Sequence, residues 1–226
     1  MGFKERSFGQ PTYQQQEEEP TRVIIISCEG TNTEPEYFKA IREKLKDNIS
    51  SLVKIELVPK PDNSSEPKHV LDNLQGFVDK YDFNKDHDSL WLVCDREKVI
   101  HRKTGKKGLL TIIPLCEEKG YSIALTNPLF EFWLLLHLID ITNYNNATLF
   151  YNQKLSPNVR YIDNELSNIL EGGYSKKKDQ FNRDIVSLEN VKRAIKQEQL
   201  FENDLTNVMD KLGGNLSSLI NEIVTF

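Results

Sequence analysis

The sequence predicts an α/β fold: an open, mainly parallel four-stranded sheet with helices on both faces, followed by a C-terminal helical elaboration. Two short apolar runs, 23–28 and 90–94, are rich in residues that favour strands and are bounded by polar residues. Such runs are typical of strands buried on both faces, as in a parallel sheet. Helical patterns separate the predicted strands, which indicates repeated strand–helix units.

The length and composition allow one well-filled domain with an addition to it. The chain has 226 residues, of which 38% are hydrophobic and 28% charged, and its net charge is -5. This charge argues against broad coating of nucleic acid, but it allows a local basic rim. No run reaches the roughly 18 apolar residues of a membrane-spanning helix, and the N-terminus lacks a secretory pattern, so we expect a cytoplasmic protein without a membrane partner.

We divide the chain into three parts. Residues 1–20 are rich in Gln, Glu and Pro and predict a disordered N-terminal tail. Residues 21–140 form the α/β core, and residues 141–226, where strand signals fade, form a helical extension packed on it. The helices expected in the extension lie at 161–170, 186–202 and 204–224, the last interrupted at Gly213-Gly214.

The core elements follow from periodicity and from residues that start or stop an element. Thr33 and Glu36 form a capping box for the first helix. Pro59 stops the second strand, which we place toward an edge of the sheet. Asn127 and Pro128 supply an N-cap and an N1 residue for a helix that is apolar nearly all round and therefore buried. The expected strands lie at 23–28, 52–58, 89–94 and 121–125, and the other core helices at 67–80, 108–119 and 129–139.

Acidic residues follow two of these strands directly. Glu29 comes after the first strand, and Asp95 and Glu97 come after the third. The carboxyl ends of parallel strands meet at one edge of the sheet, where open α/β sheets bind ligands. Three carboxylates there repel one another unless a cation neutralises them, which predicts a Mg²⁺ or Mn²⁺ site. The plainer interpretation is that these acids cap helices or face solvent.

The buried helix at 129–139 adds a fourth candidate acid at the same edge. Glu131 lies in its first turn, where it can also simply stabilise the helix dipole. His137, farther along this helix, is expected to be a core histidine rather than a ligand. The sequence contains no P-loop, no dinucleotide-binding glycine motif and no serine-hydrolase elbow, so the carboxylates are the only coherent chemical set.

Two basic clusters can contact a phosphodiester backbone. The first follows the third strand, and the second follows Gly172-Gly173-Tyr174. Charge runs are often only solvated loops, so neither cluster decides the function by itself. The candidate nucleic-acid contacts are Arg102, Lys103, Lys106, Lys107 and Lys177.

At these residues the chain resembles the RloB family, small prokaryotic proteins with a TOPRIM-like core that are associated with phage-defence and restriction loci. The resemblance covers most of residues 22–212, and its first and third motifs together are specific. The motifs lie at 28–38 (Glu-Gly, Thr-Glu and Tyr-Phe), 93–97 (the second acidic motif), 127–137 (Asn-Pro-Leu-Phe-Glu), 174–176 (Tyr-x-Lys) and, more weakly, 206–212.

The resemblance implies a TOPRIM-like fold and a site in which Glu29, Asp95 and Glu97 hold Mg²⁺ or Mn²⁺. Glu131 and Lys176 would complete the catalytic set, with Lys176 neutralising developing charge. Glu97 stands where Asp is usual, which leaves the number and spacing of metals open.

The implied activity is a metal-dependent endonuclease that hydrolyses a phosphodiester in RNA, tRNA included, or in DNA. It would act as a toxic effector in antiphage or abortive-infection defence, with the cation activating water for attack on phosphorus. A separately encoded ATPase is the implied partner, and a homodimer is open. Two alternatives remain: a non-catalytic TOPRIM-like module that docks on an ATPase or nucleic acid, and nucleotidyl transfer of the primase type.

Overall fold

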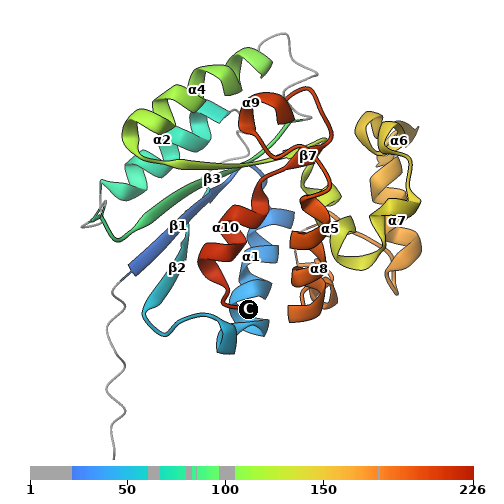
Figure 1. Ribbon diagram of the computed structural model, residues 1–226, viewed down its shortest axis with the longest axis horizontal. Helices are drawn as coiled ribbons and strands as arrows, with labels where there is room; N and C mark the ends of the chain where they lie inside the picture. Colours follow the sequence, from blue (N-terminus) through green and yellow to red (C-terminus); the bar gives the residue numbers. More distant parts are fainter. Residues whose placement is uncertain (1–21, 61–66, 80–82, 85, 97–104, 178) are drawn as a thin grey trace, which may run out of the picture.

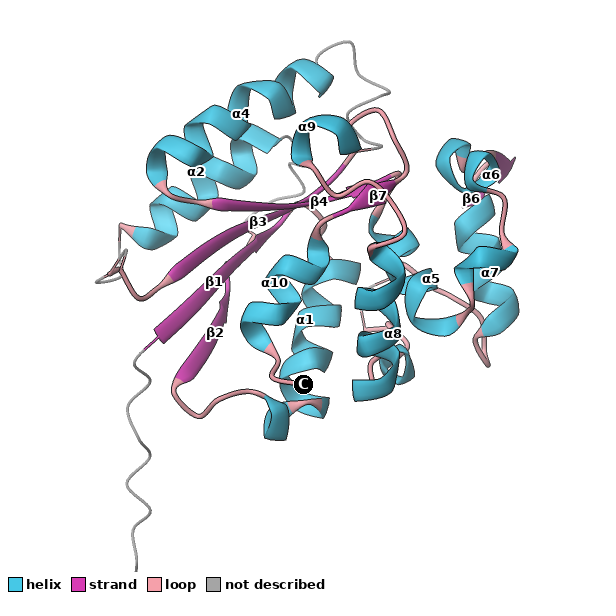
Figure 2. Cartoon of the chain, in the orientation of Figure 1, coloured by secondary structure: helices cyan, strands magenta, loops and turns pink. Residues whose placement is uncertain are grey.

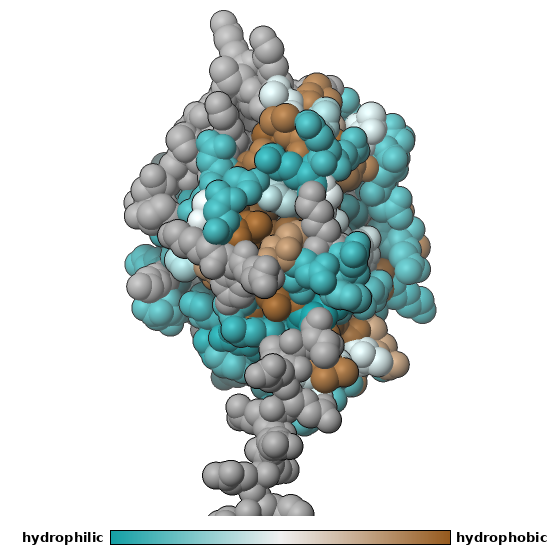
Figure 3. Space-filling view, turned by 90° about the vertical axis from the view of Figure 1, so that its left-hand side faces the viewer, coloured by the Kyte–Doolittle hydropathy of each residue, from teal (hydrophilic) through white to brown (hydrophobic). Residues whose placement is uncertain are grey.

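The computed structural model describes residues 22–60, 67–79, 83–84, 86–96, 105–177 and 179–226 (Figure 1). The predicted N-terminal tail lies outside these residues. None of the helices in the described part of the chain is long and apolar enough to cross a membrane. On the face shown in Figure 3, hydrophilic residues predominate and hydrophobic ones form small patches among them.

A five-stranded sheet forms the centre of the molecule, with strand order β2-β1-β3-β4-β7. Its first four strands are parallel, and β7 runs antiparallel to β4. The four predicted strands and the edge position of the second are therefore confirmed, but the predicted sheet lacked β7. The strands are β1 (Arg22–Cys28), β2 (Val53–Leu57), β3 (Ser89–Asp95), β4 (Ser122–Asn127) and β7 (Gly213–Gly214).

Helices cover both faces of this sheet, as predicted (Figure 2). Strand β1 shows why: Ile24 and Ile26 enter the core cluster on one face, Ile25 enters the cluster on the other, and all three are 0% exposed. Alternate strand residues point to opposite faces, so both faces need a helical cover. The longer helices are α1 (Thr33–Lys44), α2 (Pro67–Val78), α4 (Gly105–Lys119), α5 (Phe130–Leu138), α7 (Tyr161–Ile169), α8 (Leu188–Glu198) and α10 (Leu216–Ile223).

The C-terminal part of the chain is not purely helical. Its short elements are α6 (Asn146–Tyr151), α9 (Leu205–Val208), 3-10 turns at Ile141–Asn143 and Arg183–Ile185, and a small hairpin of β5 (Lys154–Ser156) and β6 (Val159–Arg160); a further 3-10 turn, Lys46–Asn48, follows α1 in the core. The predicted interruption of the helix at 204–224 is confirmed at Gly213-Gly214, but these residues form β7, and the part before them is helical only in α9. Gly213 lies so close to the chain at Glu202 that a Cβ there would be 1.9 Å from the Glu202 carbonyl oxygen, so the glycine permits this strand contact.

Two predicted helix caps are also wrong. Asn32, not Thr33, precedes α1, and Glu36 forms ion pairs with Lys39 and Arg183 instead of closing a capping box. Helix α5 begins at Phe130, so Pro128 is not its first residue. Asn127 ends β4, and its side-chain amide donates to the carbonyl oxygens of Val208 (2.7 Å) and Lys211 (2.9 Å). The side chain of Asn127 thus connects the end of β4 to the segment after α9, and Leu129, not Asn127, precedes α5.

Candidate functional site

Glu29 and Asp95 lie side by side at the carboxyl edge of the sheet. The Asp95 backbone N–H donates to Glu29 Oε2 at 3.1 Å, although the two residues are 66 positions apart. The parallel ladder fixes this contact, because Cys28 is in register with Val93 and the Glu29 N–H donates to the Val93 carbonyl at 2.8 Å. Both acids are buried, with exposed fractions of 0% and 6%.

The neighbouring strand holds the Asp95 side chain. Thr126 is the register partner of Asp95 on β4, and its hydroxyl donates to Asp95 Oδ1 at 2.9 Å. The next side chain, Arg96, bonds elsewhere: its Nε donates to the Met209 carbonyl at 2.5 Å. Arg96 therefore ties the strand end to the segment after α9.

The turn after β1 packs tightly against Glu34. The Gly30 N–H donates to Glu34 Oε1 at 3.0 Å, and a Cβ on Gly30 would lie 1.9 Å from Glu34 Oε2. Lys60, which follows β2, donates from its ammonium to the Glu29 carbonyl oxygen. Gly30 thus lets the Glu34 carboxylate lie close to the backbone, and Lys60 brings a positive charge to the same edge.

Burial and nearby acids raise the pKa values of two thiols next to these acids. Burial first, and then the charges of Glu29 and Asp95, raise the pKa of the Cys94 thiol well above its ordinary value. Burial, with Glu34 next, does the same to the pKa of Cys28. Both thiols therefore stay protonated at neutral pH and are poor metal ligands, since the thiolate is the form that binds metals.

A second group of charged side chains surrounds Lys176. Its ammonium lies 3.1 Å from Glu131 Oε1 and 2.8 Å from Asp163 Oδ1. The Tyr174 hydroxyl donates to the same Glu131 oxygen at 2.7 Å. Both acids are buried, at 5% and 9% exposure, whereas the Lys176 side chain is 47% exposed. One cation is thus shared by carboxylates from α5 and α7.

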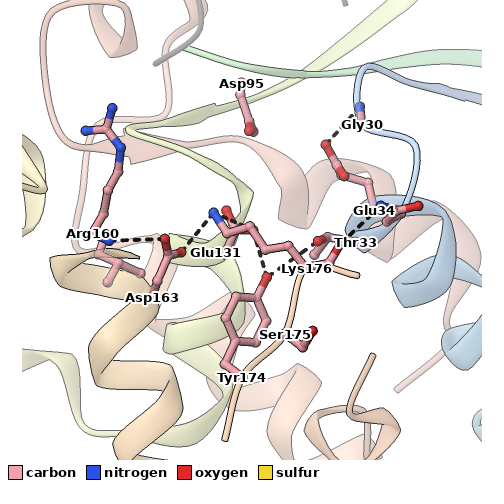
Figure 4. Close-up of polar contacts among 12 residues, drawn as sticks. Gly30, Thr33, Glu34, Asp95, Glu131, Arg160, Asp163, Tyr174, Ser175 and Lys176 are labelled. Carbon is pink, nitrogen blue, oxygen red and sulfur yellow. Dashed lines mark hydrogen bonds and ion pairs between the residues drawn. The ribbon is translucent and has the colours of Figure 1, made fainter. Parts of the chain in front are cut away.

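The loop between β1 and α1 connects the two groups. Asn32 donates from its side-chain amide to the Lys176 carbonyl at 3.1 Å, and the hydroxyls of Thr33 and Tyr174 are 3.5 Å apart. In Figure 4 the Asp95 carboxylate points toward the Glu131–Lys176 group. The segment from the end of β1 to the start of α1 therefore links the strand-end acids to the lysine group.

A family model supports the resemblance that the motifs indicated. The model of the RloB-like proteins matches residues 24–225, nearly the whole chain. The chain belongs to the RloB-like family. No curated protein and no solved structure gives a significant match to it.

In this RloB-like protein, the structure does not describe every predicted site residue. Glu97, Arg102 and Lys103 lie outside the described residues. Lys106 and Lys107 fall in the first turn of α4, but their side chains are not described. Lys177 is exposed, and its backbone N–H donates to the Ser175 hydroxyl at 3.2 Å.

The described acids have the donor chemistry that Mg²⁺ prefers, but only two of them are in contact at the strand ends. Among the described residues, no group of three or more His, Cys, Asp or Glu side chains is placed to hold a metal ion. Glu29 and Asp95 supply hard oxygen donors, and Mg²⁺ is commonly bound by one or two carboxylates together with waters. The donor chemistry of this RloB-like protein therefore fits Mg²⁺ or Mn²⁺, with Glu97 as the third donor that the motif indicates.

Sequence reasoning missed Asp163 and gave Tyr174 no role in the site. Asp163 is the third residue of α7, where an acid is expected to stabilise the helix N-terminus, so its position gave no separate signal. Tyr174 entered only through the Tyr-x-Lys motif. His137 is fully buried between Tyr37 and the Trp133 carbonyl, which agrees with a core histidine.

Proposed function

We propose that this RloB-like protein is a metal-dependent endonuclease with a TOPRIM-like core, which hydrolyses a phosphodiester bond in RNA or DNA as a toxic effector of antiphage defence. The observation that supports it most is the 3.1 Å hydrogen bond from the Asp95 backbone N–H to Glu29 Oε2, which brings acidic residues of two strand ends together at the carboxyl edge of the sheet, where α/β sheets bind ligands. Lys176 adds a cation to the same site.

The charges of the site favour a metal-dependent mechanism. Its acids outnumber its lysines, with Glu29, Glu34, Asp95, Glu131 and Asp163 against Lys60 and Lys176. A nucleic-acid backbone is itself anionic, so such a site would repel its substrate without an additional cation. A bound divalent cation supplies this charge, stabilises the leaving oxygen and lowers the pKa of water.

The residues of the chain have separate roles in this proposal. Glu29 and Asp95, together with Glu97, hold the cation, and Thr126 orients Asp95 by donating to its Oδ1. Glu131 orients Lys176, whose ammonium neutralises the charge that develops on the phosphate in the transition state. Mobile surroundings would weaken such stabilisation, and the burial of these carboxylates opposes mobility.

The described part of the site is also compatible with the alternative of a non-catalytic module. The described residues contain no set of three acids arranged as metal ligands, so a scaffold that docks on an ATPase or on nucleic acid fits this part of the site equally. The family resemblance adds a separately encoded ATPase as the proposed partner in both cases. Metal binding separates the two proposals.

The test is cleavage of labelled tRNA, single-stranded RNA and DNA by purified protein with Mg²⁺ or Mn²⁺. We expect cleavage by the wild type and a loss of at least about 10³-fold in Glu29→Ala, because the cation loses a ligand. The matched control is Glu189→Ala, an exposed acid in the first turn of α8. Melting temperatures report whether each variant is folded.

Two results would contradict the nuclease proposal. Equal cleavage by Glu29→Ala and wild type would remove the site assignment. Calorimetric titration that detects no Mn²⁺ binding dependent on Glu29, together with intact nucleic acid in every assay, would favour the non-catalytic module.

A further inference from the structure

Other parts of the protein hold both the backbone and the ammonium of Lys176. Asn32 donates to the Lys176 carbonyl at 3.1 Å and so fixes the backbone. The ammonium lies between Glu131 Oε1 at 3.1 Å and Asp163 Oδ1 at 2.8 Å (Figure 4). The four-carbon stem between these points is half-exposed and would otherwise be mobile, because a lysine side chain carries about 2 kcal/mol of rotamer entropy.

Of the two carboxylates, Asp163 gives the ammonium its shorter contact. Glu131 Oε1 also accepts the Tyr174 hydroxyl at 2.7 Å, so this oxygen is shared between two donors. Asp163 separates its interactions: Oδ1 contacts Lys176, and Oδ2 accepts the Arg160 backbone N–H at 3.3 Å. The capping contact is long and the lysine contact short, so helix capping does not account for Asp163 alone.

Burial makes the charge of Asp163 depend on Lys176. Desolvation raises the pKa of Asp163, and the nearby ammonium opposes this effect. An ionised acid at 9% exposure is costly unless it is paired. The α7 N-terminus and Lys176 are its partners, which makes Asp163 and Lys176 an interdependent pair.

We propose that Asp163 is a positioning residue that holds the Lys176 ammonium where it acts on the substrate phosphate. Asp163 reaches Lys176 from α7, outside the sheet, and no motif of the sequence assigned it a role. The inference rests on the proposed function, because it gives Lys176 a catalytic task. It adds that the helical extension sets the geometry of that task.

The activity test combines Asp163→Asn with Lys176→Met. We expect Asp163→Asn to lower kcat roughly 10- to 100-fold with little change in KM, because the ammonium is displaced. In the Lys176→Met background the same change should have almost no effect on kcat. Asp163→Glu should recover part of the activity. Asp184→Asn is the matched control, since Asp184 forms an exposed ion pair with Lys44 at 2.9 Å.

An NMR measurement makes the inference independent of activity. In spectra selective for lysine ammonium groups, Lys176 should give a protected signal in the wild type and in Asp184→Asn, and lose it in Asp163→Asn. An unchanged signal, an unchanged kcat, or an equal fall of kcat in the Lys176→Met background would overturn the positioning role. Failure of all nucleic-acid cleavage with the expected NMR result would instead refute the nuclease and leave the geometric part of the inference supported.

Discussion

The two charged groups of the site are held by different parts of the structure. Glu29 and Asp95 are fixed by the backbone of neighbouring parallel strands, and both are at most 6% exposed. Lys176 comes from a loop, is half-exposed, and depends on side chains of α5 and α7 for its position. One group is thus built into the sheet, whereas the other is assembled by ion pairs.

This difference separates two tasks. In the proposed nuclease, the buried strand-end acids would supply oxygen donors held by the sheet, which suits a cation that demands near-ideal geometry. The lysine group contains its own cation, and its two carboxylates hold the Lys176 ammonium in the position from which it would act on a phosphate. We therefore expect metal binding to depend on the first group and the rate of the chemical step to depend on both.

The largest expected effect comes from changing an acid at one end of β3 and comparing it with an acid at the other end. Asp95→Asn should lower nucleic-acid cleavage by about 10³-fold, or roughly 4 kcal/mol of transition-state stabilisation, since it removes a charge from the proposed metal site. Asp88→Asn is the matched control. Asp88 precedes β3 at the amino edge, where it accepts the Val23 N–H at 2.7 Å.

The measurement is the initial rate per folded protein, together with Mn²⁺ affinity. Asp88→Asn should change stability without changing the rate. If both variants lost cleavage equally, the carboxyl edge would have no special role, and the distinction between the two groups would lose its basis.

Most of the sheet could be predicted from the sequence, because each parallel strand is a short apolar run with a clear end. The sequence was insufficient for β7, whose two residues are glycines without any strand propensity. Their pairing with Thr126 and Asn127 arises from tertiary contacts of the segment that follows α9. The hairpin of β5 and β6 was missed for a related reason, since its strands are too short to show alternation.

The candidate site likewise contains residues that could be predicted from the sequence and residues that could not. Glu29 and Asp95 could be predicted, since strand ends and register follow from the local pattern. Asp163 could not, because its contact with Lys176 joins a helix to a distant loop, and only the folded chain brings them together. Site residues that follow directly after a strand can be predicted from the sequence, because the strand itself is recognisable. Site residues that meet only through ion pairs between distant segments show no such pattern.

A smaller effect, on the pH dependence of stability, tests whether the end of α5 is as well shielded from water as the core of the sheet. Helix α5 carries Glu131 at the site and His137 inside the protein, where burial lowers the pKa of His137 from 6.5 to about 4. Between these pH values the unfolded chain binds the proton and the folded protein does not, so stability falls as the pH is lowered. The expected loss from pH 7 to pH 4 is about 3 kcal/mol of unfolding free energy.

Urea unfolding at a series of pH values measures this loss. His137→Gln should flatten the dependence between pH 6.5 and pH 4, whereas His87→Gln, at an exposed histidine, should leave it as steep as in the wild type. A His137→Gln profile parallel to that of the wild type would show that water reaches this end of α5.

The smallest effects compare one hydroxyl donor in each group. Thr126→Val removes the donor to Asp95 Oδ1, and Tyr174→Phe removes a donor to Glu131 Oε1. Thr126→Val should cost about 2 kcal/mol of unfolding free energy, because hydrogen bonds to charged groups contribute roughly 1.5–3 kcal/mol. Tyr174→Phe should cost about 1 kcal/mol or less, since Glu131 keeps the Lys176 ammonium at 3.1 Å as a partner.

Urea unfolding at neutral pH ranks the two variants, and the cleavage rate should follow the same order. A larger loss in Tyr174→Phe would mean that the phenol, rather than the ammonium, supports the charge of Glu131. The group around Lys176 would then be a hydrogen-bonded network as rigid as the strand ends, and its ion pairs would no longer explain how the lysine is placed.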